Sequence, residues 1–265
     1  MKKRFIRGGA IGLVALGLST LGIFASDALQ GIDSRAGVGG SSLCPQGMTL
    51  FSGSEGQLCI DIYEASVAVA CPHPSPRNVF ESEKNASTDG CYAASIDKRA
   101  PWTYVTLAQA QRLCAASGKR LPTSDEWYTL ALGTTGEECQ IEGDAPRESG
   151  ESGCRSSAGA FDMVGNVWEW TNETVNGNMY RERALPSEGY VHEADASGIA
   201  ITTESSQGSE LYGNDYFWSK SEGVFGMIRG GFYGSGNDAG LYTVNASVPT
   251  NFATAGLGFR CVKSM

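Results

Sequence analysis

Residues 159–170, GAFDMVGNVWEW, combine two carboxylates with a tight turn, an arrangement that suits cation binding. Asp162 and Glu169 flank Gly165-Asn166, which favours a turn because glycine adopts positive φ freely and asparagine tolerates it. The surrounding side chains are large and apolar, and carboxylates among them must be paired, hydrogen-bonded or bound to a metal. Side-chain oxygens and turn carbonyls suit calcium, which takes about 6–8 oxygen ligands. The alternative is a core turn in which both carboxylates accept hydrogen bonds from backbone N–H groups.

Further motifs accompany this stretch in a fixed order. They are CIDIYEAS at 59–66, GKRLPTSDEW at 118–127, RGGFY at 229–233 and a closing GFRC at 258–261. Together with residues 159–170 they resemble the sulfatase-modifying-factor family, the formylglycine-generating-enzyme type of domain. The resemblance covers roughly residues 44–262, and we assign residues 44–265 to this domain.

The resemblance implies an irregular, loop-rich α+β fold of the C-type-lectin-like kind. It also implies one structural calcium ion, held by the side chains of Asp162 and Glu169 and the backbone carbonyls of Gly165 and Val167. A second metal site of the family would fall near Gln140, where the other ligand positions do not align.

The resemblance also shows where catalytic residues are missing. Enzymes of this family oxidise a substrate cysteine to formylglycine with copper held by two cysteines, which lie four and nine residues after the second glycine of RGG. Counted from Gly231, these positions hold Ser235 and Gly240, and there is no cysteine between Cys154 and Cys261. A hydroxyl and a bare backbone do not replace two thiolates on a soft Cu(I) ion. We therefore expect no copper and no oxidase activity of the family's usual kind.

What remains between RGG and GFRC is a polar segment suited to contact. It is rich in Tyr, Gly, Ser, Asn, Asp and Thr, the mixture of rigid aromatic area and adaptable hydrogen-bonding groups found in antibody paratopes. It also resembles the variable region of retroelement-diversified C-type-lectin-like proteins. The predicted ligand-contact face comprises Tyr233, Ser235, Asn237, Asp238, Tyr242, Asn245 and Asn251. The alternative is an ordinary polar surface loop.

The elements that position these residues are partly visible in the sequence. Alternating apolar residues predict a strand at 58–63, and 101–105 and 256–261 are also expected to be strands. T-x-x-Q at Thr106 and T-x-x-E at Thr123 predict capping boxes, and Gly118 and Gly133 end the two helices. Residues 71–91 are expected to form a surface loop, and residues 170–227 a long excursion over the domain surface with little regular structure.

The cysteines and the N-terminus indicate export. Eight cysteines allow 105 pairings, and local order favours Cys44–Cys59, Cys71–Cys91 and Cys139–Cys154. For the remaining two, the family resemblance implies Cys114–Cys261. A basic start followed by an uncharged run at 8–25 predicts that residues 1–28 are a signal peptide or a membrane anchor. Residues 29–43 are expected to be a flexible linker, with the domain outside the cytoplasm.

Two functional hypotheses follow. The preferred one is an exported, catalytically degenerate module that recognises an extracellular protein or glycan and is a candidate for retroelement diversification. The other is an oxidoreductase or maturation enzyme of the formylglycine-generating type with a non-cysteine residue set. The net charge of −9 argues against a nucleic-acid partner. Membrane association is expected only through the N-terminal segment.

Overall fold

The computed structural model describes residues 43–53, 56–151 and 153–265. The predicted signal or anchor segment, and all of the predicted linker except Leu43, lie outside the described residues. Residues 40–265 cluster as one unit. In the described part of the chain, no helix is both long and apolar enough to cross a membrane.

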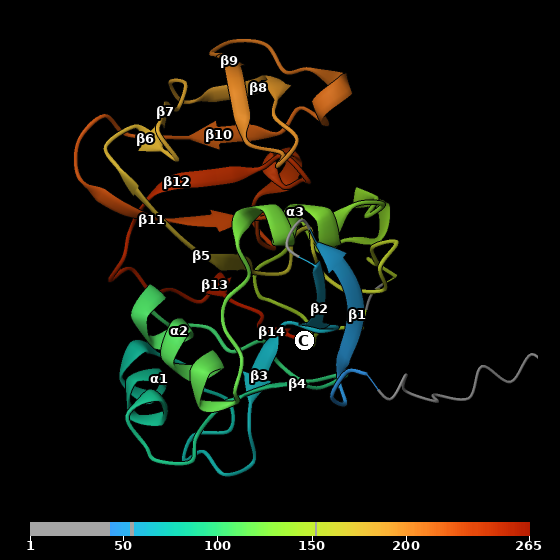
Figure 1. Ribbon diagram of the computed structural model, residues 1–265, viewed down its shortest axis with the longest axis vertical. Coiled ribbons are helices and arrows are strands. Elements are labelled where there is room, and N and C mark those ends of the chain that lie inside the picture. The colour runs from blue at the N-terminus through green and yellow to red at the C-terminus, as the bar shows by residue number, and fades with distance from the viewer. Residues whose placement is uncertain (1–42, 54–55, 152) are drawn as a thin grey trace, which may run out of the picture. The chain divides into compact units, whose positions relative to one another are not determined.

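One large mixed sheet makes up most of the C-terminal half (Figure 1). Its strand order is β7-β6-β5-β11-β12-β10-β8-β9, and β13 pairs in parallel with β5. The bounds are β5 Trp168–Asn176, β6 Met179–Tyr180, β7 Arg183–Ala184, β8 Gly189–Ala194, β9 Ala200–Glu204, β10 Tyr216–Trp218, β11 Val224–Arg229, β12 Val244–Pro249 and β13 Leu257–Gly258.

This sheet corrects the prediction for residues 170–227. The segment is not an irregular surface excursion, because β5 to β11 lie in it and bury a core of their own. Val191, Phe217 and Met227 are fully buried there, together with Val244 from β12. The strands are short and interrupted by polar turns, so their alternation is weak in the sequence. These strands are stabilised by burial within the sheet, and a local sequence pattern does not reveal that burial.

Two smaller sheets form around the N-terminal part of the domain. The first has the order β1-β2-β14, with β1 Met48–Gly53, β2 Gly56–Asp61 and β14 Val262–Ser264. The second pairs β3 Ala65–Val67 with β4 Ala93–Ser95. The strand predicted at 58–63 is therefore confirmed as β2. The observed strand ends at Asp61, two residues before the predicted end. The strand expected at 256–261 is confirmed in part, as β13.

Both predicted capping boxes are present at the starts of α2 and α3. In α2 Leu107–Ala116, Thr106 and Gln109 exchange backbone and side-chain hydrogen bonds, and Thr123 and Glu126 do the same in α3 Ser124–Ala131. Each helix turns one apolar side to the core. Short 3-10 turns occupy Gly136–Glu138, Glu210–Tyr212 and Gly236–Asp238.

Two local predictions were wrong. The segment at 71–91 is not only a loop, since it contains α1 Val79–Ala86, which Asn78 caps through its side chain. Residues 101–105 are buried in part but form no strand. Tyr104 has a positive φ of 60°, which breaks an extended run, and its N–H donates to the carbonyl of Thr254 instead.

All eight cysteines pair as expected. The disulfides are Cys44–Cys59, Cys71–Cys91, Cys139–Cys154 and Cys114–Cys261. The last one joins α2 to the chain just before β14 across 147 residues. A sheet-rich, disulfide-stapled α+β domain with few helices is therefore confirmed.

Candidate functional site

The turn at 162–167 is fixed by backbone contacts from distant segments. Asp162, Gly165 and Asn166 all have positive φ, at 56°, 76° and 51°. Glycine is required at 165, because a Cβ there would lie 2.3 Å from the carbonyl oxygen of Gln140. The N–H of Asn166 donates to that same carbonyl over 2.7 Å. The sequence prediction of a tight turn is confirmed.

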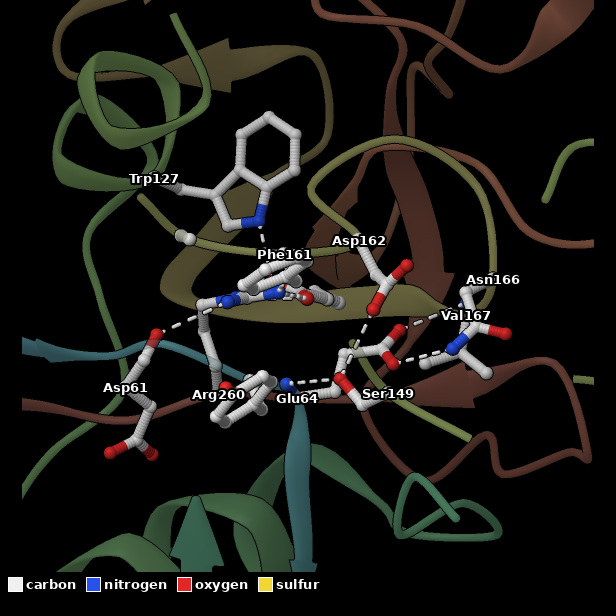
Figure 2. A network of polar contacts seen from close by, with 12 residues as sticks. Asp61, Glu64, Trp127, Ser149, Phe161, Asp162, Asn166, Val167 and Arg260 are labelled. Carbon is white, nitrogen blue, oxygen red and sulfur yellow. Dashed lines mark hydrogen bonds and ion pairs between the residues drawn. The ribbon is translucent and has the colours of Figure 1, made fainter. Parts of the chain in front are cut away.

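Asp162 and Glu169 are both buried, but their side chains have different partners (Figure 2). One oxygen of Asp162 accepts from the N–H of Gly150 at 2.7 Å and from the hydroxyl of Ser149 at 3.2 Å. Glu169 accepts from Nε and Nη2 of Arg260 at 2.6–2.9 Å and from Nε1 of Trp127 at 2.7 Å. Burial alone would lower the pKa of Arg260, but the adjacent Glu169 carboxylate raises it. Arg260 is therefore a permanent cation beneath the turn.

Glu64 completes this network and was missed by the sequence analysis. Its carboxylate lies directly behind the turn, where it accepts hydrogen bonds from the side-chain amide of Asn166 and from the N–H of Val167. Burial raises its pKa well above the usual value, and the carboxylates of Asp162 and Glu169 raise it further. The available signal was its place inside the CIDIYEAS motif, directly after the strand predicted at 58–63.

Two of the buried carboxylates near the turn form ion pairs with basic side chains. Asp61 lies 2.6 Å from Lys119, and Arg260 bonds Glu169. Glu64 accepts hydrogen bonds from two neutral donors, the side-chain amide of Asn166 and the N–H of Val167. Burial and the neighbouring carboxylates destabilise a charged Glu64, and either a proton on Glu64 or a nearby cation would relieve this. A calcium ion on the predicted set of Asp162, Gly165, Val167 and Glu169 would share Glu169 with Arg260. The calcium site therefore stays a prediction.

At the two positions where the resemblance implies copper-binding cysteines, this chain has Ser235 and Gly240. The hydroxyl of Ser235 accepts a hydrogen bond from the N–H of Phe232 at 3.0 Å. At Gly240 a side chain would require the Asp215 carboxylate to move, since a Cβ would lie 1.8 Å from its Oδ1. The Asp215 carboxylate, 2% exposed, accepts from the N–H of Tyr242 at 2.6 Å. Burial raises the pKa of Asp215 to about 7.

The predicted contact residues occupy more than one place. Tyr233 and Asn245 line a pocket of about 320 Å³ together with Trp168, Phe232 and Phe252. Asn237 and Asn251 are exposed, and Asp238 is half-buried in the adjacent 3-10 turn. Aromatic residues of β5 and of the segment after β12, which the sequence analysis did not assign to a site, make up much of this pocket.

Tyr242 belongs to a separate group of rings. It packs against Tyr128 and Tyr212 with centroid distances of 5.7 and 5.0 Å, and these rings lie over the core of the large sheet. Arg229, fully buried, stacks its guanidinium over Trp127 and Tyr128 in the same region. Tyr242 therefore has a packing role in addition to any contact role.

Comparisons with known proteins agree with the motif evidence. Residues 63–265 match the family model described as the sulfatase-modifying factor enzyme 1-like domain. The inactive C-alpha-formylglycine-generating enzyme 2 of Bos taurus is 30% identical over 124 residues, and the protein of the same name from Mus musculus is 29% identical over 124 residues. Each match covers 37% of this chain and 40% of the relative, so the chain matches less than half of the length of these relatives.

Solved structures give weaker matches that extend over more of the chain. The Major Tropism Determinant I1 variant has a TM-score of 0.48 and 20% identity, covering 84% of this chain and 53% of that one. The Treponema denticola variable protein 1 has a TM-score of 0.44 and 13% identity, covering 81% of this chain and 94% of that one.

Proposed function

Because the chain belongs to the sulfatase-modifying factor enzyme 1-like domain family, we propose that it uses this fold to recognise an extracellular protein or glycan rather than to oxidise cysteine. Function resides in sites carried by a fold, so family membership alone does not decide activity. The proposal depends on what occupies the place of the catalytic thiolates.

The observation that carries the proposal is the contact between Gly240 and Asp215. A side chain at 240 would collide with a buried carboxylate that is hydrogen-bonded to the backbone of Tyr242. A thiolate at this position is absent from the sequence, and a side chain there would require the Asp215 carboxylate to leave its hydrogen bond to Tyr242. All eight cysteines are used in disulfides elsewhere.

Loops held on a rigid scaffold are common places for binding. The segment at 234–255 lies between RGG and GFRC and contains the sheet strand β12, and on either side of that strand it has exposed Asn237 and Asn251, near the pocket residues Tyr233 and Asn245. This arrangement supports ligand contact, and sequence variation, including diversification by a retroelement, is tolerable at its exposed positions outside β12. Four disulfides indicate an oxidising, extracellular or lumenal environment, in accord with export.

The test compares two surface variants of the full chain on an array of extracellular proteins and glycans. The first carries four alanines on the contact face, at Tyr233, Asn237, Asp238 and Asn251. The matched control carries four alanines at exposed positions around α1, at Glu83, Ser87, Asp89 and Tyr92. Tyr242 is left intact because its ring is packed.

We expect the wild type and the control to bind the same array member and the contact-face variant to lose that binding. Because aromatic anchors dominate interfaces, Tyr233→Ala alone should cost roughly 2 kcal/mol if it is a hot spot. Equal binding by both variants would place the contact face elsewhere. Turnover of a thiol peptide by the copper-loaded wild type would support the oxidase hypothesis and overturn the proposal.

A further inference from the structure

Four aromatic side chains form a continuous stripe on one face of the large sheet. Tyr190 in β8 contacts Tyr216 in β10 with a centroid distance of 5.1 Å, and Tyr216 contacts Trp218 at 4.7 Å. Trp218 then meets Trp168 at the start of β5, at 5.8 Å. All four rings are half-buried, so each keeps part of its surface open to solvent. We call these residues the aromatic stripe.

Strand register explains why the stripe lies on the outer face. Side chains alternate along a strand, so Tyr216 and Trp218 point away from Phe217, which is fully buried in the core on the other side. Cross-strand partners share a face, and Tyr216 pairs with Tyr190 while Trp218 pairs with Asn245. Figure 1 shows β8, β10 and β12 side by side in this sheet.

The stripe reaches a pocket at its Trp168 end and has carboxylates beside its two middle rings. Trp168 and Asn245 line the 320 Å³ pocket described above, which connects the stripe to the contact face. Glu188 directly precedes β8, so extending the register that pairs Phe217 with Gly189 by one residue would set it opposite Trp218. Glu188 and Asp238 are both close enough to raise the pKa of the Tyr216 hydroxyl, after burial, which is the larger cause.

We propose that the aromatic stripe binds lysine and arginine side chains of an extended basic segment in a protein partner. The proposal rests on the recognition role above and specifies the chemistry of its ligand. Ring faces attract cations, arginine more often than lysine, and neighbouring carboxylates strengthen this attraction. The chain carries a net charge of −9, so a basic segment is complementary and an acidic one is repelled. The sheet already shows one such contact, since Lys220 lies 5.6 Å from the ring centroid of Phe225.

The experiment titrates the full chain with an eight-residue peptide of alternating arginine and serine and follows tryptophan fluorescence, with calorimetry in parallel. A glutamate–serine peptide and a neutral oligosaccharide are the comparison probes. We expect binding of the basic peptide alone, weakening as salt rises. Trp218→Ala should reduce its affinity roughly tenfold and Glu188→Gln roughly threefold. Tyr92→Ala and Glu222→Gln, both exposed and outside the stripe, are the matched controls and should bind as the wild type does.

The outcomes separate this inference from the recognition role itself. Binding of the oligosaccharide in place of the peptide, with the same loss in Trp218→Ala, would overturn the basic-segment assignment while leaving recognition intact. Peptide binding that is unchanged in both stripe variants would show that the stripe is not the site. If the wild type captures an array partner through the contact face but does not bind the peptide, only the inference fails. If neither the array nor the peptide is bound, both proposals fail.

Discussion

Protonation of Asp215, which is hydrogen-bonded to the contact segment, makes the stability of the protein depend on pH. Its carboxylate holds the backbone of Tyr242, and its pKa is raised from 3.8 to about 7 mainly by burial. The folded state therefore binds a proton more tightly than the unfolded state, and this contribution to stability is lost as pH rises from about 4 to about 7. We expect the melting temperature of the wild type to fall over this range and that of Asp215→Asn to fall less.

Melting curves across this pH range, followed by circular dichroism, measure the effect. Asp89→Asn, at an exposed position, serves as the control and should follow the wild type. If the melting temperatures of the wild type and Asp215→Asn changed with pH by the same amount, the Asp215 carboxylate would not titrate in this pH range.

The buried carboxylates beneath the turn lead to the calcium prediction. Asp162, Glu64 and Glu169 are close enough for Asp162 and Glu169 to raise the pKa of Glu64. A cation on Asp162, Glu169 and the carbonyls of Gly165 and Val167 would offset this repulsion. We expect an excess of chelator to lower the melting temperature, and Asp162→Ala to remove that sensitivity. Added calcium should restore the wild type, while an identical melting curve with and without chelator would count against the site.

At the residue scale, the burial of the carboxylates could be predicted from the sequence, whereas their hydrogen-bond and ion-pair partners could not. Asp162 and Glu169 were recognised as carboxylates in an apolar setting, and both are buried. Their surroundings were not predictable, since Arg260 lies 91 residues from Glu169 and Glu64 lies 102 residues from Asn166. Such pairs are formed by the fold, and a single sequence contains no local signal for them.

At the scale of the elements, the core of the large sheet provides a direct test of its packing. Phe217 is fully buried in β10 between β8 and β12. Phe217→Ala should lower the free energy of unfolding by about 3–5 kcal/mol, because a large apolar side chain is lost and a cavity remains. Leu211→Ala, at a position 80% exposed, should change it little. Chemical denaturation measures both, and comparable small effects would mean that residues 170–227 lie on the surface after all.

Elements with local signals were predicted well and elements without them were not. The caps of α2 and α3 follow from residues three positions apart, so the sequence contains the whole motif. The strands of the large sheet depend on partners elsewhere, as in the parallel pairing of β10 with β12. Residues 170–227, which include Tyr216 and Trp218, were therefore predicted to form an irregular surface segment, whereas these two residues lie in a strand of the sheet.

At the scale of the whole molecule, the disulfides determine how the separate parts are joined. Cys114–Cys261 connects α2 to the end of the chain across 147 residues, whereas Cys71–Cys91 closes a local segment of 20 residues around α1. Three of the four pairs agreed with local order in the sequence, and only family resemblance indicated the long one. Chain-entropy arguments assign more stabilisation to the longer loop.

The last prediction compares these two bridges. Replacing both members of Cys114–Cys261 with alanine should lower the free energy of unfolding by roughly 2 kcal/mol more than the same change at Cys71–Cys91, because the entropy of the unfolded chain grows with the logarithm of loop length. All four cysteines are buried, so the loss of packing at the sulfur atoms is similar in the two variants and largely cancels in the comparison. Denaturant unfolding of both variants, each with its other three disulfides verified by peptide mapping, provides the measurement. An equal or larger loss in the variant without Cys71–Cys91 would show that the local bridge, rather than the link from α2 to the C-terminal strand, dominates the stability of the domain.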